Sequence, residues 1–437
     1  MRATLTGALG GLLFGFDTVV ISGAIDSLVR LYHLSPQAKG LTVAIGLVGT
    51  VIGALAAGQV GQRLGSRETL RITALLYVVS AFGCALGVSW TSFMVFRFIG
   101  GLGIGASSVL GPVYIAELAP AKWRGRLVAV FQLNVVFGVM AAYMSNYFIR
   151  TLQLGATEWR WQVGVAAAPA ILFLILLFGI PRSPRWSASR NRNDEALAVL
   201  ELMGEPNPRA ELEDIRAALA QEHASAHEPV FRWKYRYPLF LAISIGAFNQ
   251  LAGINAILYY LPDIFASAGF NQLSSDAQSI AIGATNFLFT LVGMAFIDKA
   301  GRKTLLLIGA AGCAACLGGV AWIFAAQTHP GALLWLLIAF IAFFSVSQGA
   351  VIWVYIGEVF PTSVRSKGQG VGSASHWFMN AIIAQLFPIV VHDMNTATPF
   401  IFFAVMTAVQ FLVVLVVYPE TKGQTLEALQ RKLLGTT

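Results

Sequence analysis

Charged residues are scarce in this chain of 437 amino acids: only 11% are Asp, Glu, Lys or Arg, whereas 57% are hydrophobic. Soluble domains carry about 25% charged residues, so the composition excludes an ordinary water-soluble domain. Cysteine is scarcer still. The three cysteines, Cys84, Cys313 and Cys316, lie within apolar runs, and no second pair follows the Cys313–Cys316 spacing. We interpret them as small apolar residues of helices, and we expect no metal and no cofactor.

The net charge of +8 could suggest a nucleic-acid partner, but the position of the cations argues against one. Residues 182–237 contain nine basic and nine acidic residues, so this segment is balanced. The excess of Lys and Arg lies in short segments between apolar stretches, which is a signal of membrane topology. We therefore expect a lipid bilayer as partner and no nucleic acid.

Long apolar runs make up most of the sequence. A membrane-crossing helix needs about 20 mainly apolar residues. With the N-terminus in the cytoplasm, inside segments hold 24 of the 29 Lys and Arg residues, outside loops hold 4, and Arg97 lies within a span. Without the nine in the central segment, 15 against 4 remain, which predicts both termini inside. The twelve predicted spans are 5–25, 40–61, 69–89, 93–117, 127–149, 161–181, 238–268, 278–297, 304–326, 333–357, 368–391 and 399–418.

An internal repeat relates the two halves of the chain. Residues 114–124 and 355–365 both read Y-I-x-E-x-x-P-x-x-x-R, and residues 63–70 are similar to residues 299–305. Each motif follows the same numbered helix in its half, and six helices separate the copies, so the halves have the same orientation in the membrane. Parallel halves of this kind bind substrate near the midplane and transport it by rocking.

These patterns predict an all-α membrane protein with twelve transmembrane helices in two parallel six-helix halves, joined by a cytoplasmic helical linker. The linker helices have capping signals at Asn193 and at Asn207-Pro208. The predicted parts are an N-terminal half at 1–181, the linker at 182–237, a C-terminal half at 238–418 and a cytoplasmic tail at 419–437.

Charges at the cytoplasmic ends of the fourth and tenth spans are expected to bias the transport cycle. Glu117 with Arg124, and Glu358 with Arg365, can pair across neighbouring helices in one state and separate in the other. Taken singly, each charge could instead be an anchor at the membrane surface.

Four further motifs occur at matching helix numbers. They are residues 10–18 in the first span, 97–101 at the start of the fourth, 181–186 after the sixth and 419–423 after the twelfth. Together with the repeat, they resemble the sugar porter family of the major facilitator superfamily over nearly the whole chain. The resemblance extends the conformational charge network to Arg63, Arg67, Glu117, Arg124, Asp298, Arg302, Glu358, Arg365 and Glu420.

The resemblance also implies a pyranose site in a central cavity. Amides are suitable sugar ligands because they both donate and accept hydrogen bonds without charge, while an aromatic face covers the apolar side of the ring. For each polar residue the alternative is a helix–helix hydrogen bond, worth about 0.6 kcal/mol in membranes. The positions that match sugar ligands are Gln132, Gln250, Asn255, Asn286 and Trp353, with Phe14, Tyr259, Tyr260 and Trp377 as flanking aromatics.

Several positions depart from the family pattern. Asn249 replaces one of two consecutive glutamines, so a sugar contact there is expected through water. His376 precedes Trp377 where Gln or Asn is usual, and it could bind sugar, titrate or pack. Gln62 and Ser66 replace an Asp and an Arg in the first loop motif, and Arg182 replaces a Glu. The first copy of the charge network is therefore expected to be weaker.

Asp17 lies about thirteen residues into the first span, where an unpaired carboxylate would be costly. Arg97 is the expected partner. Burial favours the neutral carboxyl and the guanidinium favours the ionised one, so protonation of Asp17 would free Arg97 and permit the rearrangement. This pair resembles that of bacterial sugar–proton symporters, whereas passive glucose carriers of the family generally have Asn at this position. We expect proton symport and see no cluster of oxygen ligands for sodium.

Other function classes remain as alternatives. A passive sugar uniporter would share the whole scaffold. A non-transporting sugar sensor would carry a long signalling tail, and only nineteen residues follow Tyr418. An intramembrane enzyme is not supported, because Gly101-x-Gly103-x-Gly105 lies in an apolar helix without a preceding strand. We expect a monomer in the plasma membrane, and the sequence leaves open which monosaccharide, a hexose or a pentose such as glucose or xylose, is carried.

Overall fold

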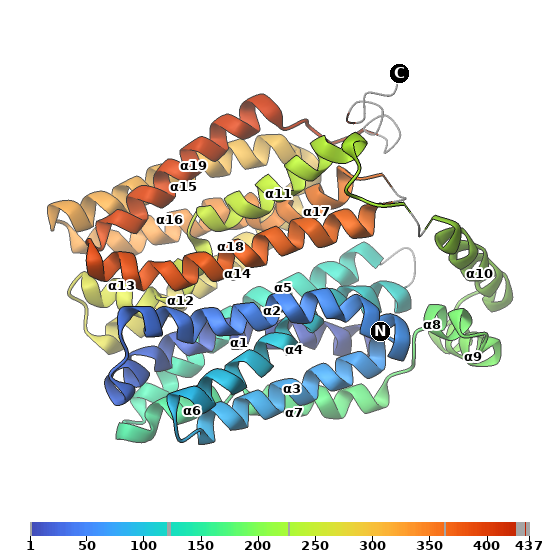
Figure 1. Cartoon of the computed structure of the whole chain (residues 1–437), viewed down its shortest axis with the longest axis horizontal. Coiled ribbons are helices and arrows are strands. Elements are labelled where there is room, and N and C mark those ends of the chain that lie inside the picture. The colour runs from blue at the N-terminus through green and yellow to red at the C-terminus, as the bar shows by residue number, and fades with distance from the viewer. Residues whose placement is uncertain (1, 120–123, 226–227, 362–363, 425–432, 434–437) are drawn as a thin grey trace. The chain divides into compact units, whose positions relative to one another are not determined.

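The computed structural model describes residues 2–119, 124–225, 228–361, 364–424 and 433. Within them, twelve helical segments are long and apolar enough to cross a membrane, which confirms the predicted number of spans. The helices are α1 (Arg2–Tyr32), α2 (Pro36–Leu64), α3 (Ser66–Leu86), α4 (Trp90–Leu118), α5 (Arg124–Thr151), α6 (Glu158–Gly164), α7 (Ala167–Leu176), α8 (Pro184–Ser189), α9 (Asn193–Met203), α10 (Pro208–Ser225), α11 (Arg236–Leu251), α12 (Ile254–Tyr259), α13 (Leu261–Ser267), α14 (Gln272–Ala300), α15 (Arg302–Ala326), α16 (Leu333–Val346), α17 (Gln348–Glu358), α18 (Arg365–Asp393) and α19 (Ala397–Val417) (Figure 1).

The chain packs into two compact units. The first unit comprises Met1–Thr18, Gly49–Val139 and Val163–Glu228, and the second comprises Val19–Val48, Met140–Gln162 and Pro229–Thr437. The second unit therefore contains the parts of α1, α2 and α5 that lie nearest Tyr32, Pro36 and Thr151. The sequence repeat places its halves at other boundaries, and that division stays a prediction.

Glycines allow the backbones of α2 and α4 to approach closely in the first unit. A Cβ added at Gly49 would lie 2.4 Å from the Phe98 carbonyl oxygen, and one added at Gly105 would lie 2.1 Å from the Thr50 carbonyl oxygen. No larger side chain fits at these positions without moving a backbone. Gly105 therefore serves helix packing, as expected for small residues at helix crossings in membranes.

The seventh predicted span is broken, as the positions of Gly253 and Pro262 suggest. α11 ends at Leu251, and Gly253 has φ = 80°, in the left-handed region that favours glycine. A Cβ at Gly253 would also lie 2.3 Å from the Phe403 ring. Two short helices, α12 and α13, continue the span. A second break, at Ser347 between α16 and α17, has no counterpart in the predicted spans.

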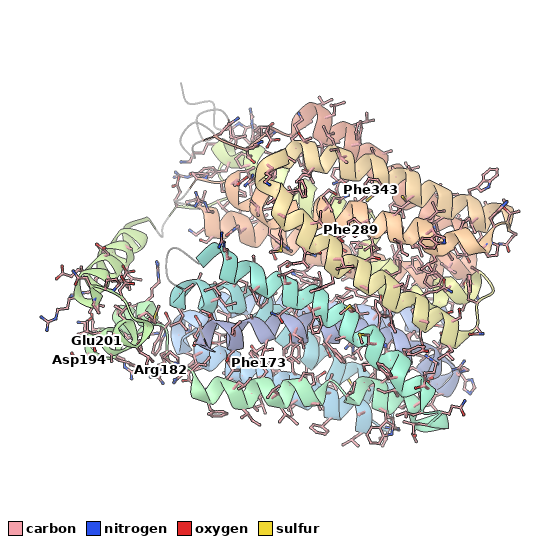
Figure 2. The ribbon with its side chains drawn as sticks, turned by 180° about the vertical axis from the view of Figure 1, so that it is seen from behind. Phe173, Arg182, Asp194, Glu201, Phe289 and Phe343 are labelled. Carbon is pink, nitrogen blue, oxygen red and sulfur yellow. The ribbon has the colours of Figure 1, made fainter. Side chains whose placement is uncertain are left out.

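The helices α8, α9 and α10 lie in the segment that the sequence predicts as the linker, and that role stays a prediction (Figure 1). The Asn207 side chain accepts a hydrogen bond from the Ala210 N–H at 3.3 Å, which confirms that cap. The cap predicted at Asn193 is wrong: α9 begins at Asn193, and Arg192 occupies the cap position without a side-chain hydrogen bond. A tight turn with φ = 57° at Asn191 precedes α9, and the helix begins one residue before the predicted start. Asp194 and Glu201 project from α9 and are exposed (Figure 2).

Candidate functional site

Asp17 and Arg97 are in direct contact inside the first unit. Arg97 Nη1 donates to Asp17 Oδ2 and to the Asp17 main-chain oxygen, both at 3.2 Å. Their side chains are only 6% and 8% exposed for Arg97 and Asp17 respectively. A Cβ at Gly100 would lie 2.4 Å from Ser80 Oγ and 3.4 Å from Asp17 Oδ2, so glycine leaves room for the Ser80 side chain beside the carboxylate. The structure places together two residues that the sequence pairs, and their role in coupling stays a prediction.

Gln250, on α11, is the centre of an amide cluster in the second unit. Its Nε2 donates to Asn249 Oδ1 at 3.1 Å, and its Oε1 accepts from Asn255 Nδ2 at 3.1 Å. The same Nε2 lies 3.2 and 3.3 Å from the two ring nitrogens of His376 on α18. Because an amide nitrogen only donates, the His376 nitrogen that faces it acts as acceptor. The break at Gly253 brings Asn255 back toward Gln250.

Aromatic rings surround this amide cluster. The Trp353 and His376 rings have centroids 5.1 Å apart, and those of His376 and Trp377 are 5.0 Å apart. Trp353 is 37% exposed, whereas Trp377 is 4% exposed, so the Trp353 face is the accessible one. Tyr259 is buried, and its hydroxyl accepts from Asn380 Nδ2 at 3.0 Å. Tyr260 donates to the Ala384 carbonyl oxygen at 2.9 Å.

The other predicted sugar ligands are half-buried. Asn286 Oδ1 accepts from Ser345 Oγ at 2.9 Å and from Thr290 Oγ1 at 3.5 Å, which leaves its amide nitrogen for another acceptor. Phe14 and Gln132 belong to the first unit. The family resemblance assigns them to the same sugar site, and that assignment stays a prediction.

The first copy of the repeat makes a neutral contact where the second copy makes an ion pair. Ser66 Oγ donates to Glu117 at 3.1 Å, with the Arg185 charge nearby. Instead of meeting at Glu117, three arginines converge on Glu68 of α3. They are Arg67 at 2.6 Å, Arg71 at 2.9 Å and Arg182 at 3.4 Å.

Arg190, from the linker, donates to the main-chain oxygens of Gln62 and Arg63, each at 3.2 Å. A linker residue thus holds the end of α2, where Gln62 departs from the family pattern. The Arg124 and Asp298 side chains lie outside the described residues.

The second copy keeps a charged pair. Arg302 Nη2 donates to Glu358 Oε1 at 2.9 Å, and Thr421 Oγ1 donates to Glu358 Oε2 at 2.7 Å. Glu420 accepts the main-chain N–H groups of Arg302 and Lys303 at the start of α15. Arg365 is the first residue of α18.

Comparison with known proteins identifies the family. Residues 3–433 match the family model described as "Sugar (and other) transporter". An arabinose-proton symporter of Bacillus subtilis is 36% identical over 97% of this chain and 92% of its own length. A glucose facilitated diffusion protein of Zymomonas mobilis is 32% identical over 98% of this chain and 96% of its own length. The xylose transporter XylE of Escherichia coli, in a partially occluded inward-open conformation, superimposes with a TM-score of 0.87 at 32% identity, covering 97% of this chain and 99% of that chain.

The chain belongs to this sugar transporter family. The resemblance read from the motifs is thereby confirmed, as is the major facilitator fold of twelve membrane helices. A member of this family is a transporter and not an enzyme.

Sequence reasoning missed two groups of contacts in this sugar transporter. The first group donates hydrogen bonds to predicted site residues. Asn380 donates to Tyr259, and Ser345 donates to Asn286. Lys39 and Arg150, two of the four cations assigned to outer loops, each bind carboxylates within the second unit. One signal could have indicated the ion pairs of Lys39 and Arg150. Each is a loop cation next to an apolar span, and an Asp or Glu lies near the same end of another span.

Proposed function

We propose that this chain is a proton-coupled symporter of a monosaccharide that works by alternating access. The observation that carries the proposal is the buried contact between Asp17 and Arg97. A carboxylate at this depth is stable only with a partner or when protonated. Protonation of Asp17 removes the charge that holds the Arg97 guanidinium. Proton binding is therefore coupled to the arrangement of α1 and α4.

The proposed sugar site in the second unit uses Gln250, Asn255, Asn286 and the exposed face of Trp353. Amide groups satisfy hydroxyls in either direction, and the indole covers the apolar side of a pyranose. Asn249 and His376 already contact Gln250, so we propose that they orient its amide while His376 faces the sugar. Pentoses and hexoses both suit such a site.

A passive uniporter is the second candidate. It is favoured by the likeness to the facilitated diffusion protein of Zymomonas mobilis, because membership of the family does not decide between the two modes. Asp17 is the feature that favours symport here. We further propose a monomeric, multi-pass plasma membrane protein with both termini in the cytoplasm, on the charge count of the loops.

Asp17→Asn tests the driving force. In energised vesicles we expect the variant to lose accumulation of radiolabelled sugar against a gradient, because the amide cannot release a proton. Counterflow exchange in proteoliposomes should persist, and it serves as the internal control for folding and sugar binding. Accumulation by the variant equal to that of the parent would remove Asp17 as the coupling group.

The choice of sugar is tested separately. Thermal unfolding of the purified parent with D-xylose, L-arabinose, D-glucose or D-galactose should show stabilisation by the transported sugar, because ligand binding to the folded state raises its stability. Asn286→Ala is the matched variant, and it should lose the shift without losing its own melting transition. Equal shifts in parent and variant would exclude Asn286 from the site.

A further inference from the structure

A charged cluster joins α1, α2 and α13 within the second unit. Lys39 Nζ lies 3.4 Å from Asp26 Oδ1 and 2.5 Å from Asp263 Oδ2. The three side chains are 20%, 27% and 19% exposed for Lys39, Asp26 and Asp263. Two carboxylates from separate helices therefore depend on a single ammonium group for their neutralisation.

A second cluster lies around Arg150 at the end of α5. Its guanidinium pairs with Asp276 of α14 and, at 3.2 Å, with Glu158 of α6. Gln272 joins the two clusters, because its Oε1 accepts from Arg150 Nη1 at 2.7 Å and its Nε2 donates to Asp26 Oδ2 at 2.8 Å. Asp276 is 2% exposed, so loss of Arg150 would leave a carboxylate buried without its partner.

The contacts connect segments far apart in the chain. α1, α2 and α5 precede the linker, whereas α13 and α14 follow it. An alternating-access transporter opens at one end at a time, so any contact between such segments at one end must break when that end opens. The same end carries Lys39 and Arg150, which the loop charge count assigns to the outer side.

We infer that Lys39 and Arg150 are positioning residues of a lock that holds this end of the second unit closed, through ion pairs with Asp26, Asp263 and Asp276. The inference rests on the proposed alternating-access function and adds the residues that control one of its two openings. Breaking the pair of Arg150 with the buried Asp276 is costly. The lock therefore sets how often this end opens, without contact with the sugar.

A cavity beside the first cluster provides a place to measure opening. It has a volume of about 450 Å³ and is lined by Lys39, Asp263 and Ile264, with Val29, Phe387 and Val391 among its apolar walls. Ile264 is 2% exposed, so a cysteine at this position is shielded while the end is closed. The three native cysteines are buried.

The experiment measures the rate at which a maleimide labels Ile264→Cys in the purified full-length protein. Lys39→Ala and Arg150→Ala should each raise the rate roughly tenfold, since each removes the charge that neutralises half-buried or buried carboxylates. The charge swap Lys39→Asp with Asp263→Lys should return the rate to near that of the parent. Arg30→Ala is the matched control, because Arg30 is an exposed cation near the same end of α1, and it should change nothing.

Unchanged labelling in both alanine variants would overturn the lock, as would an equal increase in Arg30→Ala. A charge swap that keeps the parent's melting temperature but labels fast would overturn the assigned pairing. Should Lys39→Ala lose its melting transition, Lys39→Met keeps the side-chain volume and supplies the same comparison. The labelling requires no sugar or proton gradient, so its outcome is independent of the Asp17→Asn test.

Discussion

At the scale of single residues, Glu420 shows how one carboxylate organises a helix start. Its oxygens accept main-chain N–H groups from Arg302, Lys303, Thr421 and Lys422 at 2.9–3.1 Å. Partial burial acts to raise the pKa of Glu420, but these N–H donors outweigh it and hold the pKa below its ordinary value. The ionised form is therefore the one that the folded protein stabilises.

Glu420→Gln should lower the melting temperature at pH 7, with a loss of about 1 kcal/mol typical of a helix N-terminal contact. Because the folded pKa is depressed, this stabilisation is present above the unfolded value of 4.5 and is lost as pH falls through the folded value. The difference between parent and variant should therefore shrink when melting is followed from pH 7 down to about 3.5. A difference that stays constant over this range would show that the charge of Glu420 is irrelevant.

A charged residue in the middle of an apolar span is the kind of residue whose partner sequence reasoning can predict. Asp17 with Arg97 is predicted because a charge in a membrane needs a partner, and the structure contains that pair. Asn380 with Tyr259 has no such requirement, since a neutral amide finds many partners on neighbouring helices. The packing of α12 against α18 selects Tyr259 as the partner.

At the scale of elements, the packing of α1, α2 and α13 brings two carboxylates to one ammonium group. Asp263 faces Lys39 from α2 and Asp26 from α1, with Tyr260 beside it and His392 of α18 in the same cavity wall. With both carboxylates ionised the three charges sum to −1, and one proton makes the cluster neutral.

Asp263→Asn is a further test of the lock at this scale. It removes the ion pair that joins α2 to α13, so Ile264→Cys should be labelled faster in this variant than in the parent. A labelling rate equal to or below that of the parent would contradict the pairing of Lys39 with Asp263.

The breaks within the spans were unequally predictable. Gly253 and Pro262 are residues whose backbone preferences interrupt a helix, and the span breaks between them. Ser347, at the second break, adopts φ = −107° and ψ = −89°. Serine does not by itself end a helix, so this break follows from packing that the sequence pattern does not express.

At the scale of the whole molecule, the repeat found in the sequence is also a repeat of contacts. Tyr114 donates to the Pro181 carbonyl oxygen at 2.8 Å, and Tyr355 donates to the Pro419 carbonyl oxygen at 3.1 Å. Each tyrosine opens its copy of the Y-I-x-E motif, and each proline follows the last span of its half. The two copies of the motif therefore occupy equivalent positions in the chain.

The equivalent glutamates differ in what they contact, and this predicts unequal effects on transport. Glu358 accepts from the charged Arg302 and from Thr421, whereas Glu117 accepts from the neutral Ser66. A carboxylate bound by a guanidinium gains attraction between opposite charges, which a neutral hydroxyl donor does not supply. Glu358→Gln should therefore reduce the initial rate of sugar uptake about tenfold, and Glu117→Gln only about two- to threefold. Both are measured in proteoliposomes at matched protein content, each with its melting temperature as the control for folding.

Ser66→Arg, which restores the family's charge to the first copy, should bring the effect of Glu117→Gln up to that of Glu358→Gln. Equal losses in the two single variants would mean that the Arg185 charge near Glu117 compensates for Ser66, and that the two copies bias the transport cycle equally despite their different contacts.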